Sequence, residues 1–136
     1  MSYLVDTNVI SELRKKDRAD PAVTSWFAGL KEDEIYLSVL TVGEIRRGIT
    51  NVARRDPPAA SNLNQWLARI VMGFDGRIIP IDTTIAQEWG RMNSPDPLPT
   101  IDGLLAATAR IRGMTLATRN VRDVARAMVE VVDPFA

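Results

Sequence analysis

The stretch YLVDTNVISEL (residues 3–13) decides the fold of this chain. Its first apolar residues, Tyr3 to Val5, predict a short strand, and a helical pattern follows from residue 8. Asp6 stands at the junction between the two. In a parallel α/β sheet, such junctions lie together at the carboxyl edge of the strands. Acids that are far apart in the sequence can therefore meet in space if the same arrangement recurs along the chain.

The arrangement does recur, because apolar segments alternate with helical ones over the whole sequence. Strands are expected at Tyr3–Val5, Ile35–Val39, Ile78–Ile81, Met114–Ala117 and Val129–Val132. Helices are expected at 8–15, 21–31, 42–53, 59–73, 83–92, 101–112 and 121–127, with a proline-rich loop at 93–99. The alternation predicts βαβ units around a mostly parallel sheet. With 136 residues, of which 46% are hydrophobic, we expect one domain spanning residues 1–136.

The composition narrows the chemistry. The chain has no histidine and no cysteine, which removes the Ser-His-Asp and Cys-His catalytic routes and the usual zinc ligands. Its 17 basic and 17 acidic residues cancel, so no global field marks it as a nucleic-acid binder. We find no signal peptide and no apolar run long enough to cross a membrane, and we expect a cytoplasmic protein.

Four carboxylates, at or near predicted helix starts, are the candidate chemical groups: Asp6, Glu44, Asp102 and Asp123. Several carboxylates on one sheet edge repel one another unless they take up protons or share a cation. Mg²⁺ or Mn²⁺ would resolve this repulsion, and such ions commonly complete their coordination shell with substrate phosphate. The acids therefore point to metal-assisted chemistry on a phosphoester.

Each acid also has a purely structural interpretation. Glu44 follows Thr41 by three residues, which is the spacing of a capping box, and Asp123 follows Asn120 in the same way. Asp102 falls in the first turn of a predicted helix, where a negative charge complements the helix dipole. Taken singly, these structural interpretations are favoured.

Two aspartates that follow predicted strands, Asp6 of the four and in addition Asp82, could be structural in the same sense. Asp6 could bond its own backbone in a turn with Thr7 and Asn8. Asp82 precedes a pair of threonines and is interpreted as a helix cap.

Four runs together resemble the PIN-domain ribonucleases, and especially the VapC-like and FitB-like toxins of bacterial toxin–antitoxin pairs: LVDTNVISEL (4–13), TVGEIRRG (41–48), TIDGLLAATA (100–109) and TRNVRD (118–123). The resemblance implies a three-layer α/β/α PIN-like fold and a metal-dependent endoribonuclease. It implies that Asp6, Glu44, Asp102 and Asp123 hold Mg²⁺ or Mn²⁺ and are the catalytic residues. The polar positions that would support them are Thr7, Asn8, Ser11, Glu12, Thr118 and Asn120. Val124 departs from the family, which often has an aromatic residue after the fourth acid.

The resemblance also implies partners, namely a second copy of the chain in a homodimer, an RNA substrate and a small antitoxin protein whose tail lies in a hydrophobic groove. Two helices offer apolar side chains for such a groove: Trp26, Phe27 and Leu30 on one, and Leu63, Trp66, Leu67 and Ile70 on the other. The alternative interpretation, which holds for most of them, is ordinary hydrophobic core.

Four arginines next to the acids are possible RNA phosphate contacts: Arg46, Arg47, Arg119 and Arg122. Solvated helix faces are an equally good explanation for them. A receiver-type phosphorylation switch is disfavoured, because it needs a late lysine and the only lysines are Lys15, Lys16 and Lys31. A non-catalytic module that binds an antitoxin, and through it operator DNA, remains the alternative function.

Overall fold

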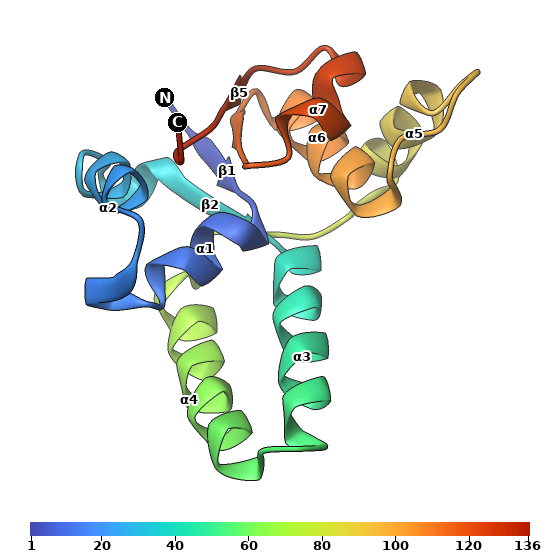
Figure 1. Ribbon diagram of the computed structural model, residues 1–136. Coiled ribbons are helices and arrows are strands. Elements are labelled where there is room, and N and C mark those ends of the chain that lie inside the picture. Colours follow the sequence, from blue (N-terminus) through green and yellow to red (C-terminus); the bar gives the residue numbers. More distant parts are fainter.

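A computed structural model describes all residues, 1–136, and shows a five-stranded, all-parallel sheet with helices on both faces (Figure 1). The strands are β1 (Tyr3–Val5), β2 (Ile35–Ser38), β3 (Ile78–Ile79), β4 (Thr115–Ala117) and β5 (Val131–Val132). They lie in the order β3-β2-β1-β4-β5, so the chain moves outward on one side of β1 and then crosses to the other side. The predicted three-layer α/β/α class is confirmed.

Seven α-helices connect the strands: α1 (Thr7–Leu13), α2 (Pro21–Ala28), α3 (Val39–Ala53), α4 (Pro57–Gly73), α5 (Thr83–Met92), α6 (Thr100–Arg112) and α7 (Val121–Val124). Short 3-10 turns occur at Lys16–Arg18, Glu32–Glu34 and Ala125–Ala127. Helices α3 and α4 form a long hairpin that projects from the sheet, whereas α5, α6 and α7 gather on the other side of the molecule (Figure 1). No helix is both long and apolar enough to cross a membrane.

Two hydrophobic cores separate the three layers, and the strands feed both of them. Leu4 packs in the core under α5 and α6, while its neighbour Val5 packs in the core under α1 to α4. Leu116 and Ala117 on β4 divide in the same way. Successive strand residues point to opposite faces, and a strand that is covered on both faces therefore reads as a continuous apolar run.

The element boundaries differ from the prediction by three residues at three helices: α2 ends at Ala28 and not at residue 31, α7 ends at Val124 and not at residue 127, and the third difference is the start of α3. This helix begins at Val39 instead of residue 42, because the Ser38 hydroxyl accepts a hydrogen bond from the Leu40 N–H (3.0 Å) and caps the helix directly after β2. Val39, predicted as the last residue of a strand, is therefore helical. Strands β3 and β5 are shorter than predicted, and α1 ends at Leu13.

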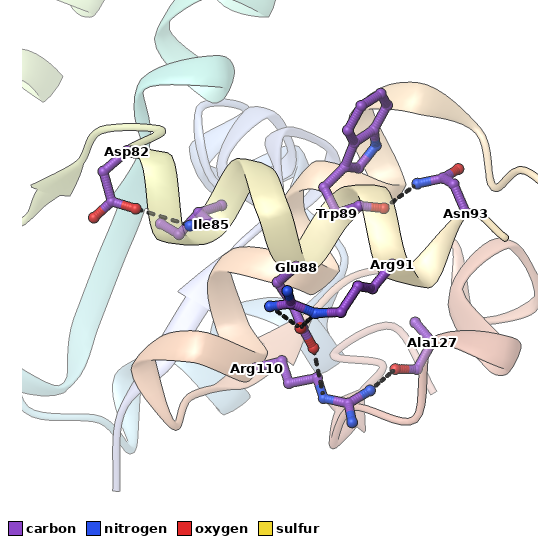
Figure 2. Close-up of polar contacts among 8 residues, drawn as sticks. All are labelled: Asp82, Ile85, Glu88, Trp89, Arg91, Asn93, Arg110 and Ala127. Atoms are coloured by element: carbon purple, nitrogen blue, oxygen red, sulfur yellow. Dashed lines mark hydrogen bonds and ion pairs between the residues drawn. The ribbon is translucent and has the colours of Figure 1, made fainter.

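The helix pair α5 and α6 is joined by polar contacts at one end (Figure 2). Glu88 on α5 forms ion pairs with Arg91 (3.0 Å) and with Arg110 on α6 (3.0 Å). The predicted cap Asp82 is confirmed, since its Oδ1 accepts a hydrogen bond from the Ile85 N–H (2.9 Å). The arginines are exposed, so both ion pairs add little stability, and only the pair of Glu88 with Arg110 helps to set how α6 lies against α5.

Candidate active site

Asp6 occupies the point where the sheet topology reverses. It follows β1 directly, and its backbone N–H donates to the Ala117 carbonyl at the end of the neighbouring strand β4 (2.9 Å). The connections from β1 and β4 lead to opposite sides of the sheet, so Asp6 lies at the topological switch point. This position in an open α/β sheet is where ligands usually bind.

The Asp6 carboxylate is almost completely buried, with 4% exposure, and is held by three donors. Its Oδ1 accepts from the Thr7 N–H (2.7 Å), and its Oδ2 accepts from the Thr118 hydroxyl (2.7 Å) and more weakly from the Asn8 amide (3.4 Å). Burial raises the pKa of Asp6 and the negative charge of Glu44 raises it further, while the hydrogen bonds from Thr118 and Thr7 oppose the shift. Asp6 is also the N-cap residue of α1, so the same carboxylate has a structural role and belongs to the acidic group.

Glu44 reaches the site from the second turn of α3. Its Oε1 accepts a hydrogen bond from the Thr7 hydroxyl (2.6 Å), which links α3 to the residue that follows Asp6. The capping-box interpretation of Thr41 and Glu44 is wrong, because Ser38 is the cap and the buried Thr41 hydroxyl has no hydrogen-bond partner. The Glu44 side chain is therefore free of the structural duty that its spacing suggested.

Asp102 and Asp123 complete the acidic group from the other side of β1. Both lie in the first turn of their helices, α6 and α7, as predicted. Asn120 is the N-cap residue of α7, but its side chain makes no cap hydrogen bond, so the capping-box interpretation of Asn120 and Asp123 is wrong. Burial raises the pKa of Asp102, and the charges of Asp6 and Asp123 raise it further, whereas a hydrogen bond from Asn120 lowers it.

The four acids thus form an electrostatic chain in which Glu44 acts on Asp6, Asp6 acts on Asp102, and Asp102 interacts with Asp123. As they stand, no three of the chain's carboxylates are arranged to hold a single metal ion. The donor set nevertheless suits a hard divalent cation, because every ligand is a carboxylate oxygen and a cation would relieve the repulsion among them. The unpartnered Thr41 hydroxyl, one turn before Glu44, is a further oxygen with no partner in the protein.

The predicted supporting residues divide into two sets. Thr7, Asn8, Thr118 and Asn120 belong to the hydrogen-bond network around Asp6, since the Thr118 hydroxyl also accepts from the Asn120 N–H (3.0 Å). Glu12 is instead engaged away from the other acids, with Lys15 (2.8 Å) and the Asp20 N–H (2.8 Å), and these contacts lower its pKa.

Ser11 lines a hollow of about 210 Å³ together with Thr7 and Glu44. Its hydroxyl forms no hydrogen bond to any of the four acids. Ser11 therefore contributes to the wall of the hollow beside Glu44 without a hydrogen bond to any of the four carboxylates.

The flanking arginines are all exposed, and the surroundings of Arg46 and Arg119 differ. The Arg119 N–H donates to the Asn8 Oδ1 (3.3 Å), and its guanidinium lies over the Phe135 ring (4.5 Å), which places this residue beside the site. Arg46 instead lines a hollow of about 830 Å³ between α3 and α4 that contains none of the four acids. Arg47 and Arg122 form no ion pair.

Gly103, next to Asp102, is a position that sequence reasoning missed. A Cβ atom at this position would lie 3.3 Å from both Leu98 and the Trp89 ring, so the absence of a side chain lets α5 pack closely against α6. A glycine inside the otherwise helix-favouring run TIDGLLAATA was the available signal.

The apolar side chains proposed for a partner groove belong mostly to the core. Leu67 is buried, and the other six pack against the core under α1 to α4. The core interpretation therefore holds fully for Leu67, whereas five of the others also line surface hollows: Phe27, Leu30 and Ile70 line one of about 310 Å³, and Leu63 and Trp66 line another of about 520 Å³. The exposed apolar residues lie elsewhere, and Val39, Val71 and Met72 meet in the hollow between α3 and α4.

Fold and site together define an α/β protein with four electrostatically coupled carboxylates at the switch point of its sheet. The family model of the PIN domain matches residues 3–127, and this chain belongs to the PIN domain family. It is 31% identical to the toxin FitB of Neisseria gonorrhoeae, with 97% of each chain covered, and 29% identical to the VapC ribonuclease Y4jK of Sinorhizobium fredii, with 97% of this chain and 96% of that protein covered.

Solved structures of related complexes share the fold of this chain. The chain resembles a FitAB complex bound to a DNA fragment, with 31% identity, a TM-score of 0.89, and 98% and 96% of the two chains covered. It also resembles the FitAcB crystal structure from Neisseria gonorrhoeae, with 32% identity, a TM-score of 0.89 and 98% of both chains covered.

Proposed function

We propose that this chain is a metal-dependent endoribonuclease and the toxin component of a type II toxin–antitoxin pair. The observation that carries the proposal is the buried Asp6, which lies at the sheet switch point and is electrostatically coupled to Glu44 and Asp102. A structural carboxylate gains nothing from being buried among other acids, whereas a cation-binding group does. The names of the relatives, a toxin and a ribonuclease, support this function.

Asp6, Glu44, Asp102 and Asp123 would hold Mg²⁺ or Mn²⁺. A bound divalent cation would supply Lewis-acid activation of water and neutralise the charge of the phosphodiester. The protein itself orients the carboxylates, because Thr118 holds Asp6 and Thr7 connects Asp6 with Glu44. The exposed Arg119 lies beside the site and suits a phosphate of the RNA. Hydrolysis would leave a 5′-phosphate and a 3′-hydroxyl.

The proposal includes a cytoplasmic protein, an antitoxin partner and a homodimer. The structural relatives FitAB and FitAcB support a protein partner. The alternative is a non-catalytic module that binds an antitoxin and, through it, operator DNA. The observation behind this alternative is that the related FitAB complex was solved bound to a DNA fragment. Retention of all four coupled acids argues for the nuclease, because their repulsion would have no use in a binding module.

The test is cleavage of a mixed RNA pool by the purified, antitoxin-free chain in Mn²⁺ or Mg²⁺, beside an EDTA control. Asp6→Asn removes the central charge but can still cap α1. Asp82→Asn is the matched control, since Asp82 caps α5 far along the chain from the four acids. We expect cleavage to need the metal, to be lost in Asp6→Asn and to persist in Asp82→Asn. Equal cleavage by Asp6→Asn and the unmodified chain would refute the site.

A further inference from the structure

The hollow beside Glu44 continues into a second hollow that none of the motifs indicated. The small hollow that contains Thr7, Ser11 and Glu44 shares four lining residues with a hollow of about 520 Å³: Arg14, Val52, Leu63 and Trp66. The larger hollow lies between the end of α1, the 3-10 turn after it and the α3–α4 hairpin, and is also lined by Lys16, Arg55 and Arg69. A continuous depression therefore runs from Glu44 to a basic surface.

The cations of this second hollow have no acidic partners. Arg14, Lys16, Arg55 and Arg69 take part in none of the six ion pairs of the protein, whereas the neighbouring Lys15 is paired with Glu12. The one acid in the lining, Asp56, is engaged as the cap of α4, because its Oδ1 accepts from the Ala59 N–H (3.1 Å). Four unpaired positive charges around one hollow favour an anionic ligand.

An aromatic surface accompanies the charges. Trp66 is half-buried, and the guanidinium of Arg14 lies 5.9 Å from the centre of its ring. Cations beside an accessible aromatic ring form the combination that binds single-stranded nucleic acid, in which the bases stack on the ring and the phosphates meet the cations. An acidic cleavage site repels RNA, so a chain that cuts RNA needs such positive charge nearby.

We propose that this basic hollow is a subsite for the RNA strand, in which Trp66 stacks on a base and Arg55 and Arg69 bind phosphates away from the scissile bond. This inference rests on the proposed nuclease function and adds to it the path of the substrate, from the acids along α1 and α3 to the α3–α4 hairpin. The subsite contributes affinity and not chemistry, so its residues are positioning residues.

The test measures binding without catalysis. A fluorescein-labelled oligouridylate of about 8 nucleotides is titrated in EDTA and followed by anisotropy. The test protein is Arg55→Ala/Arg69→Ala, and Arg54→Ala/Arg112→Ala is the control with the same loss of charge outside the hollow. Each lost phosphate contact lowers the salt slope by about 0.7, which corresponds to about fivefold in affinity at roughly 0.1 M salt. We expect about 25-fold weaker binding by the test protein and little change in the control.

Tryptophan fluorescence gives an independent readout. Stacking of a base on Trp66 should quench part of the emission, and Trp66→Phe, which preserves an aromatic side chain in the core, should abolish that part while the protein melts normally. Trp66→Ala should weaken binding by about 5- to 150-fold.

The outcomes separate the subsite from the nuclease. Equal RNA affinity of the test and control proteins, with metal-dependent cleavage intact, would overturn the subsite and leave the function standing. Absence of both binding and cleavage in the unmodified chain would overturn both. A further probe is a poly-glutamate peptide. Loss of peptide binding in the test protein with unchanged RNA affinity would overturn the RNA subsite and assign the hollow to a protein partner.

Discussion

Replacing Thr118 with Val isolates the hydrogen bond that orients the central acid. The Thr118 side chain is buried, with 1% exposure, and its hydroxyl donates to Asp6 at 2.7 Å. Valine has the same shape, so the change removes the hydroxyl and leaves the packing. A hydrogen bond to a charged group contributes about 1.5 to 3 kcal/mol. The hydroxyl also accepts from the Asn120 N–H (3.0 Å) and, at 3.5 Å, from the Asn8 amide; water replaces the first of these because Asn120 is exposed, and the Asn8 amide keeps its bond to Asp6.

The expected loss of stability can be measured by thermal unfolding in EDTA at neutral pH. For a chain of 136 residues, 1 kcal/mol corresponds to roughly 3 to 5 °C, so we expect Thr118→Val to lower Tm by about 5 to 15 °C. In an Asp6→Asn background the acceptor is neutral, and the cost of the same change should fall to about 0.5 to 1.5 kcal/mol. The double-mutant cycle therefore reports the part of the bond that depends on charge.

The pH dependence of this variant has a defined sign. The Thr118 bond lowers the pKa of Asp6 against the effect of burial, so it stabilises the ionised carboxylate. Its contribution is present above the folded-state pKa of Asp6 and is lost as the pH falls through it. The destabilisation by Thr118→Val should therefore shrink in acid. A Tm within about 1 °C of the unmodified chain at neutral pH, or a penalty that grows in acid, would refute this reasoning.

Three other predictions concern the site and its support. Asp102→Asn should raise Tm at neutral pH in EDTA. The folded-state pKa of Asp102 lies above its unfolded value, so the ionised carboxylate destabilises the fold as the pH rises, and the substitution removes that charge. A gain in Tm that does not shrink in acid would contradict this prediction. Mg²⁺ at about 100 times its Kd should stabilise the unmodified chain by about 2.7 kcal/mol in thermal melts, and equal stabilisation of Asp6→Asn would exclude Asp6 as a ligand. Gly103→Ala should cost about 1 to 3 kcal/mol in denaturant unfolding, because its Cβ would crowd Trp89. Gly90→Ala, a helical position with no neighbour within 4 Å, should instead stabilise by roughly 0.5 to 1 kcal/mol, so a gain in both variants would refute the packing argument.

Local sequence determined the order and type of the elements. The strand β1 could be recognised from its continuous apolar run, because both faces of that strand are covered. The helices α5 and α6 lie close to their expected residues, because their apolar side chains recur with a strong helical period. The position of Asp6 also followed from the sequence. In a parallel sheet every junction from a strand to the following helix lies at the carboxyl edge of the strands, and Asp6 directly follows the apolar run of β1. The sequence pattern also placed Glu44, Asp102 and Asp123 at predicted helix starts, and the resemblance to the PIN-domain ribonucleases assigned all four acids to one metal site.

Tertiary structure decided which side chains face one another. Glu44 and Arg46 are two residues apart, yet one contacts Thr7 and the other lines the hollow on the far side of α3. The rotation of a helix about its axis depends on how its apolar face packs, and a shift of the helix start from residue 42 to Val39 changes the role assigned to each position. The basic hollow around Trp66 exists only because α1 lies against the α3–α4 hairpin, and contacts between segments so far apart in the chain leave no local pattern in the sequence.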